Sequence, residues 1–147
     1  GGAVMTNEEH RRAITTPLID AHKRLVLLGL AFIAISIGTW AVDLMGLVYA
    51  CPYCRAQRTA IGILGLIILL LRVLHPFVAR YLALAVGGFG FVVGATQHFA
   101  GWRRIHAGEF ELRDQWWIDP WLLSGCALLI LALQLGIIFE HNPRRAR

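Results

Sequence analysis

Two cysteines separated by two residues are the side chains in this sequence best suited to chemistry. They lie in the run Cys51-Pro52-Tyr53-Cys54. A disulfide closed across such a short turn is strained and reducible, which suits thiol–disulfide exchange. Pro52 fits the first position of a helix, and the positive end of that helix, with Arg55 and Arg58, favours thiolate over thiol. The spacing therefore predicts a reactive pair at Cys51 and Cys54.

Two other uses of the cysteines stay open. A C-x-x-C pair can be half of a zinc site, but the sequence has no second C-x-x-C, so His98 or His106 would have to supply ligands. A static disulfide would close a loop too small to gain much chain entropy. Thioether attachment of haem needs a histidine where Arg55 stands and is excluded. Cys126, in the last apolar run, is expected to be a small buried residue.

Polar residues near the ends of the apolar runs are further candidates. His98 and His106 could form a metal or proton-transfer site with a nearby polar side chain, although an interfacial hydrogen-bonding histidine is the simpler interpretation. The nearby candidates are Gln97, Glu109 and Asp119. Asp43, after the first apolar run, is expected to be a solvated boundary residue.

The elements that position these residues are expected to lie in a membrane. Of 147 residues, 57% are hydrophobic and 16% are charged, which is too apolar for an ordinary soluble domain. The net charge of +5 does not indicate nucleic-acid binding, because the basic residues flank the apolar runs. Residues 1–4, ahead of Met5, look like a cloning or protease scar. A polar stretch precedes the first apolar run, so no cleavable signal peptide is expected.

The fold class predicted is an all-α membrane protein, a single domain over 1–147 with a bundle of four transmembrane helices. The expected spans are 25–42, 55–74, 77–99 and 120–139. His75-Pro76 breaks the chain between the second and third spans, which predicts a tight helical hairpin. Four glycines give the third span a small-residue face for close packing. They are Gly87, Gly88, Gly90 and Gly94.

The distribution of basic residues predicts the orientation. The segments expected in the cytoplasm carry Arg11, Arg12, Lys23, Arg24, Arg72, Arg80, Arg144, Arg145 and Arg147. Both termini are therefore expected in the cytoplasm, with the cysteines on the opposite, periplasmic side. Arg103, Arg104 and Arg113 in the second outer loop weaken this bias without reversing it. That loop also predicts a short amphipathic segment lying in the interface, and tryptophans and tyrosines gather at the same boundary.

The segment around the cysteine pair resembles a known family signature. It reads Ala50-Cys51-Pro52-Tyr53-Cys54-Arg55-Ala56-Gln57-Arg58. This run closely resembles the C-x-x-C-x-x-(Q/E)-R signature of the DsbB family, quinone-reducing membrane oxidoreductases that regenerate the periplasmic disulfide donor DsbA. Looser similarity extends to Arg80-Tyr81 and to the run 120–123, which open the third and fourth expected helices.

The resemblance implies a role for each matched residue. Cys51 and Cys54 would be catalytic, with Cys54 facing the quinone and Cys51 exchanging disulfides with a protein. Arg58 matches the family arginine associated with the quinone site, and its guanidinium can stabilise a thiolate or an anionic quinone oxygen. His98 is a second candidate for the quinone pocket. Gln57 is assigned no role and is expected to face a neighbouring helix or the head groups.

One departure from the family pattern is clear. Well-known members carry a second cysteine pair in a longer second outer loop, which passes electrons from DsbA to the first pair. The corresponding loop here is short and has no cysteine. Electrons must then enter the Cys51–Cys54 pair directly from a partner, or the fold serves another task.

The expected function is therefore that of a DsbB-like thiol:quinone oxidoreductase of the bacterial inner membrane. Ubiquinone or menaquinone would accept the electrons, and a DsbA-like or other thiol protein would supply them. The alternative is a non-enzymatic four-helix accessory or metal-binding protein that uses the cysteines structurally. Vitamin K epoxide reductase-like proteins also hold cysteines in a four-helix bundle, but their quinone-side C-x-x-C comes late in the bundle.

Overall fold

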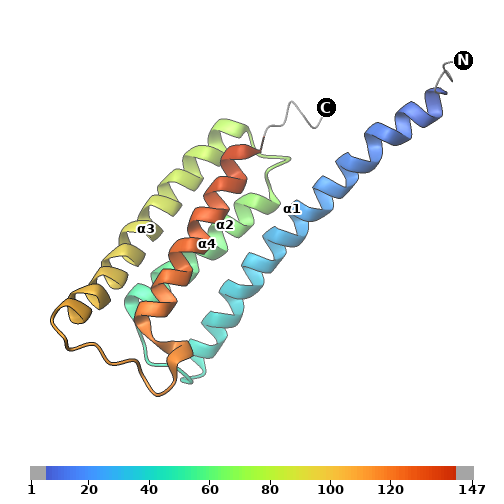
Figure 1. Ribbon diagram of the computed structural model, residues 1–147. Helices are drawn as coiled ribbons and strands as arrows, with labels where there is room; N and C mark the ends of the chain where they lie inside the picture. The colour runs from blue at the N-terminus through green and yellow to red at the C-terminus, as the bar shows by residue number, and fades with distance from the viewer. Residues whose placement is uncertain (1–5, 142–147) are drawn as a thin grey trace, which may run out of the picture.

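A computed structural model describes residues 6–141, which form four α-helices and one 3-10 turn (Figure 1). The elements are α1 (Asn7–Leu44), α2 (Pro52–Leu69), α3 (Pro76–His106), η1 (Trp116–Ile118) and α4 (Pro120–Glu140). The described residues contain no strand, so the prediction of an all-helical protein is confirmed. The expected scar at 1–4 and the basic tail residues at 144–147 lie outside the described residues.

Three of the helices, α1, α3 and α4, are long and apolar enough to cross a membrane. The helix α2 is different, because its 18 residues include Arg55, Gln57 and Arg58 within the first two turns. These polar residues lower the mean hydropathy of α2 although its remaining turns are apolar. The fourth membrane span stays a prediction.

The first helix is much longer than the expected span 25–42. It begins with a capping box, in which the Thr6 hydroxyl accepts from the Glu9 amide at 3.4 Å and the Glu9 carboxylate accepts from the Thr6 amide at 3.0 Å. The helix then continues through Pro17. In Figure 1 its N-terminal half projects beyond the other three helices. The capping box explains the early start that apolar length alone did not predict.

The hairpin between α2 and α3 is present at the predicted place. The helix α2 ends at Leu69, earlier than the expected residue 74, because the Leu70 amide is shared between the carbonyls of Leu66 and Ile67 in a tightened last turn. His75 then caps α3, with its Nδ1 accepting from the backbone amide of Phe77 at 3.2 Å. A proline follows this cap as the first helical residue.

The helix α2 is the centre of the bundle. It packs against α1, α3 and α4, and α3 packs against α4. Apolar side chains of α2 form much of the buried core, among them Ala60, Ile61, Leu64, Ile67 and Ile68. The arrangement holds the first turn of α2 in contact with the ends of the other helices.

Small residues allow the close helix contacts. A Cβ on Gly65 of α2 would lie 2.8 Å from the Cβ of Phe32 on α1. On α3, a Cβ on Gly87 would lie 2.8 Å from Leu135, and Gly90 and Gly94 also face α4 leucines. The predicted small-residue face is therefore confirmed for three of its four glycines, while Gly88 faces open space.

The start of α2, which bears the cysteine pair, and the turn between α2 and α3 lie at opposite ends of the bundle (Figure 1). The segment between α3 and α4 lies at the cysteine end. It differs from the expected flat amphipathic segment, because 102–106 continue α3 and only Trp116–Ile118 form a separate helical turn. The hairpin turn and the end of α4 lie at the other end, beside the projecting half of α1.

Candidate functional site

The two cysteines occupy the first turn of α2. Cys51 is the N-cap residue, and its Sγ accepts from the backbone amide of Cys54 at 3.3 Å. Pro52 is the first helical residue, as predicted. The two Sγ atoms lie 2.7 Å apart, and a disulfide requires about 2.0 Å. The helix start therefore holds two free thiols ready to form a disulfide with little backbone movement.

The expected solvation of Asp43 is wrong, because its side chain is buried and binds two arginines. Its carboxylate contacts Arg55 Nη2 at 2.8 Å and Arg58 Nη1 at 2.7 Å, and the residue is only 5% exposed. Arg58 Nη1 also donates to the carbonyl of Thr39 at 2.8 Å. The Trp40 ring lies against both guanidinium groups. One carboxylate thus orients two cations and leaves one positive charge in excess next to the thiols.

A pair of glutamines connects the thiols to α3. Gln97 Nε2 lies 3.6 Å from Cys51 Sγ and 3.5 Å from Cys54 Sγ. Gln97 Oε1 accepts from Gln57 Nε2 at 2.6 Å. Sequence reasoning named Gln97 only as a possible metal-site neighbour and gave Gln57 no role. One feature of the sequence could have pointed to Gln97. It is a polar residue in the last turn of the expected span 77–99, at the end predicted to lie on the same side as the cysteines.

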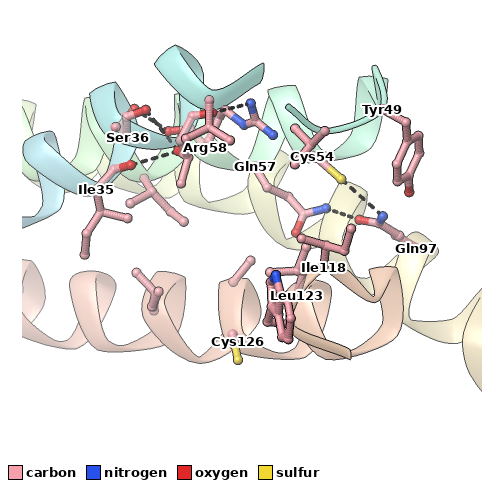
Figure 2. A pocket seen from close by; sticks show the side chains of 18 residues that line it. Ile35, Ser36, Tyr49, Cys54, Gln57, Arg58, Gln97, Ile118, Leu123 and Cys126 are labelled. Atoms are coloured by element: carbon pink, nitrogen blue, oxygen red, sulfur yellow. Dashed lines mark hydrogen bonds between the residues drawn. The ribbon is translucent and has the colours of Figure 1, made fainter. Parts of the chain in front are cut away.

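A cavity of about 330 Å³ adjoins the cysteine pair between α1, α2 and α4 (Figure 2). Its apolar lining includes Ile35, Val42, Val48, Ile118, Leu123 and Ile130. Its polar lining near the cysteines comes from Cys54, Gln57, Arg58 and Gln97. Figure 2 shows Cys54, Gln57 and Gln97 directed toward one another on one wall, with Leu123 on α4 opposite. The cavity is therefore apolar over most of its wall and reactive at one end.

His98 lies outside the lining of this cavity. Its ring stacks on Trp121 with the centroids 5.4 Å apart. Its Nδ1 contacts the Trp121 carbonyl at 3.0 Å and the Ser124 hydroxyl at 3.2 Å. The structure thus brings Cys51, Cys54 and Arg58 together and turns His98 to the start of α4, where it joins α3 to α4.

The expected burial of Cys126 is also wrong. This cysteine is exposed and belongs to the lining of the cavity. The helix α4 presents it on the wall that faces α1, and α1 packs mainly against α2 rather than α4. The gap left between α1 and α4 explains both the cavity and the exposure of Cys126.

Residues of the two loops at this end cover the pair. Cys51 is only 6% exposed. The guanidinium of Arg113 lies 4.5 Å from the centre of the Tyr49 ring, which adjoins the thiols. Burial, followed by the nearby Cys51 and Cys54, raises the pKa of Tyr49 to about 12. The Tyr49 phenol therefore keeps its proton at neutral pH and remains a hydrogen-bond donor.

The assembled site combines two adjacent thiols, an amide donor and a guanidinium at one end of an apolar cavity. Such a set can carry thiol–disulfide exchange or pass electrons to an apolar ligand beside Cys54. Within residues 6–141, no group of three or more His, Cys, Asp or Glu side chains is placed to hold a metal ion. Comparison of the chain with protein-family models, curated proteins and solved structures finds no match.

Proposed function

We propose that this protein is a DsbB-like thiol:quinone oxidoreductase of the bacterial inner membrane. It passes electrons from a periplasmic thiol protein, DsbA-like or of another kind, through Cys51 and Cys54 to ubiquinone or menaquinone. The observation that carries the proposal is the position of Cys54 in the wall of an apolar cavity of about 330 Å³, with Arg58 in the same wall.

The cavity suits a quinone head group. Its volume falls at the lower end of the range for small-molecule sites, roughly 300–1,000 Å³. Its aliphatic walls suit a substituted ring, and the side chains of Arg58 and Gln57 offer donors to ring oxygens. The cavity lies between α1 and α4, whose outer faces expose large apolar side chains such as Ile37 and Leu129. A membrane quinone would enter from that side.

The proposed reaction balances as a two-electron transfer. The thiols of Cys51 and Cys54 lose two electrons and two protons, and a disulfide bond forms between their sulfurs. The quinone accepts both electrons and both protons and leaves as quinol. Reduction of the disulfide by a partner dithiol completes the cycle, and the resemblance assigns that exchange to Cys51.

The proposed orientation puts the cysteine end of the bundle in the periplasm. Arg72 and Arg80 flank the hairpin at the other end, and the basic N-terminal half of α1 projects past that end (Figure 1). Basic residues gather on the cytoplasmic side of inner-membrane proteins. This placement would expose the pair to the compartment in which disulfides persist.

Reoxidation of the reduced protein by a soluble quinone analogue tests the proposal. Purified protein, freed of membrane quinone, is reduced, the reductant is removed, and free thiols are counted by alkylation over time after the analogue is added. Cys54→Ser should abolish reoxidation, and Arg58→Ala should slow it about tenfold to a hundredfold, the loss of one hydrogen bond to a charged group. Arg80→Ala, at the far end of α3, is the control and should react as the wild type does.

Full activity in both Cys54→Ser and Arg58→Ala would reject this mechanism. The rival interpretation, a non-enzymatic accessory or metal-binding protein, makes a different prediction. A metal ion present in stoichiometric amount and lost in Cys51→Ser would support it.

A further inference from the structure

The side-chain amide of Gln97 is the polar group on α3 that lies closest to both reactive sulfurs. Its Nε2 is 3.6 Å from Cys51 Sγ and 3.5 Å from Cys54 Sγ, so one NH2 group reaches both atoms. A neutral thiol is a weak acceptor, whereas a thiolate is a charged one. A donor in this position therefore favours the anionic form of whichever sulfur has lost its proton.

Gln57 fixes the direction in which the Gln97 amide faces. Gln57 Nε2 donates to Gln97 Oε1 at 2.6 Å, which leaves the NH2 group of Gln97 directed at the sulfurs, as Figure 2 shows for Cys54. Gln57 is 4% exposed, so little water competes for this bond. An amide turned the other way would place its carbonyl oxygen against the sulfurs and disfavour a thiolate.

We propose that Gln97 is a catalytic residue that donates a hydrogen bond to the thiolate of the Cys51–Cys54 pair, and that Gln57 is the positioning residue that orients it. Gln97 gives up neither a proton nor an electron. It stabilises the anionic sulfur that exists after the thiol proton has left and before the S–S bond closes. Its part in quinone reduction rests on the proposed function, but its effect on the thiolate does not.

Other charged and titratable groups also surround the pair and must stay constant in a test. From α1 and α2 these are Asp43, Arg55 and Arg58, and from the loops they are Tyr49 and Arg113. None of them is altered when an amide is replaced at 97 or 57. A change in thiol reactivity between such variants then reports the amide.

The test is the pH dependence of alkylation of Cys54, which lies just before the proposed span 55–74. The background is Cys51→Ser with Cys126→Ser, which leaves Cys54 as the single thiol. Gln97→Leu should raise the midpoint of the alkylation curve by about one to two pH units, the contribution of one hydrogen bond to a charged group. Below the midpoint, alkylation should be at least about tenfold slower.

A second variant keeps the test decisive if Gln97→Leu does not fold. Gln57→Met is nearly the same size and uncharged, but its side chain cannot donate a hydrogen bond. It should therefore leave the Gln97 amide free to turn and raise the midpoint, by no more than Gln97→Leu does. Gln134→Leu is the control, since Gln134 is another buried amide, bonded to the Ile61 carbonyl at 2.8 Å and outside the cavity lining.

Unchanged midpoints in Gln97→Leu and Gln57→Met would overturn the inference, and so would an equal shift in Gln134→Leu. The assay contains no quinone, so its result is independent of the proposed function. Shifted midpoints in a protein that quinone does not reoxidise would leave the role of the amide standing and reject the oxidoreductase. Quinone-driven reoxidation with unchanged midpoints would support the oxidoreductase and reject the role of the Gln97 amide.

Discussion

At the scale of single residues, the carboxylate of Asp43 has the largest influence on the electrostatics of the site. It binds Arg55 and Arg58 together, so it fixes where both cations lie relative to the thiols. The sequence predicted two arginines that stabilise a thiolate through proximity. In the structure, this stabilisation is shared with an acid, and it is outweighed at Cys54, where burial, followed by the hydrogen bond with Cys51, raises the pKa of the thiol to about 11.

Asp43→Asn is therefore expected to lower both activity and stability. The change removes the charge that holds two guanidinium groups, and Arg58 would lose its orientation toward the cavity. Quinone-dependent reoxidation should fall, and the thermal midpoint should drop. In a double-mutant cycle, Asp43→Asn should add little to the activity defect of Arg58→Ala, because Asp43 acts on activity by holding the Arg58 guanidinium in place.

The matched control for this cycle is Asp20→Asn, an exposed carboxylate on the projecting half of α1. It should leave both measurements at the wild-type value. Fully additive losses in the double variant would show that Asp43 acts independently of Arg58 and would contradict this account.

Residue spacing predicted the cysteine pair because both thiols belong to one helical turn. The partners of the pair could not be predicted in the same way. Gln97 contacts the sulfurs from a position 46 residues away from Cys51, and Asp43 reaches Arg58 across 15 residues and a loop. Such contacts depend on how helices pack, and neither periodicity nor spacing determines packing.

At the scale of the elements, the contact between α1 and α2 sets the width of the cavity. Ser36 donates from α1 to the carbonyl of Arg58 at 2.7 Å. Its side chain fills the space above Gly62, where a Cβ would clash with it. Gly65 allows a second close approach one turn further on. These close contacts between α1 and α2, the seam between the two helices, hold α1 against the face of α2 that bears Arg58.

Gly65→Ala is expected to force the two helices apart. The new Cβ would lie 2.8 Å from the Cβ of Phe32, which sits too close to the backbone to rotate away. Overpacking of this kind costs about 1–3 kcal/mol of unfolding free energy, measurable by denaturation in detergent. Gly136→Ala, where nothing lies within 4 Å, should cost nothing by this mechanism. Equal losses in the two variants would argue against a tight seam.

The loop contact between Arg113 and Tyr49 should limit access to Cys51. In a protein with Cys54→Ser and Cys126→Ser, Arg113→Ala is expected to speed alkylation of Cys51 by a bulky maleimide about two- to fivefold, the contribution of one exposed cation–π contact. Arg104→Ala, exposed on α3, serves as the control. An unchanged rate in Arg113→Ala would mean that the loop does not restrict a partner.

The helix boundaries were predicted unevenly, and the reason is physical. His75-Pro76 and the prolines at 52 and 120 give clear start signals, and all three helices begin there. The end of α2 has no such signal, because the chain through the turn that follows Leu69 contains neither glycine nor proline before Pro76 and is apolar apart from Arg72 and His75. The early start of α1 depends on local capping at Thr6. The first residues of α1 are polar, so the length of the apolar run does not indicate where the helix begins.

At the scale of the whole molecule, the predicted helical bundle is confirmed and its placement in a membrane stays a prediction. Composition was enough to predict the helical bundle. Long apolar runs separated by short polar segments are typical of helices that cross a bilayer, where every backbone hydrogen bond must be made within the protein. The cavity was not predictable at this scale, since it depends on α1 leaning on α2 and away from α4.

Cysteine labelling from one side of the membrane should establish the orientation. In a protein without native cysteines, Glu109→Cys, at an exposed position in the loop after α3, is expected to react with an impermeant maleimide added to intact cells. Val73→Cys, in the exposed turn after α2, should react only after the membrane is broken. The reverse pattern would place the cysteine pair in the cytoplasm and contradict the proposed compartment.

The most direct test of the central claim is the redox state of Cys51 and Cys54, measured by thiol alkylation in purified protein from which membrane quinone has been removed. The reduced pair is expected to remain reduced after the reductant is removed and to return to the disulfide when a soluble quinone is added, with one quinone consumed per pair. A pair that stays reduced in the presence of quinone would contradict the account, because the cavity beside Cys54 would then not deliver an electron acceptor to the thiols.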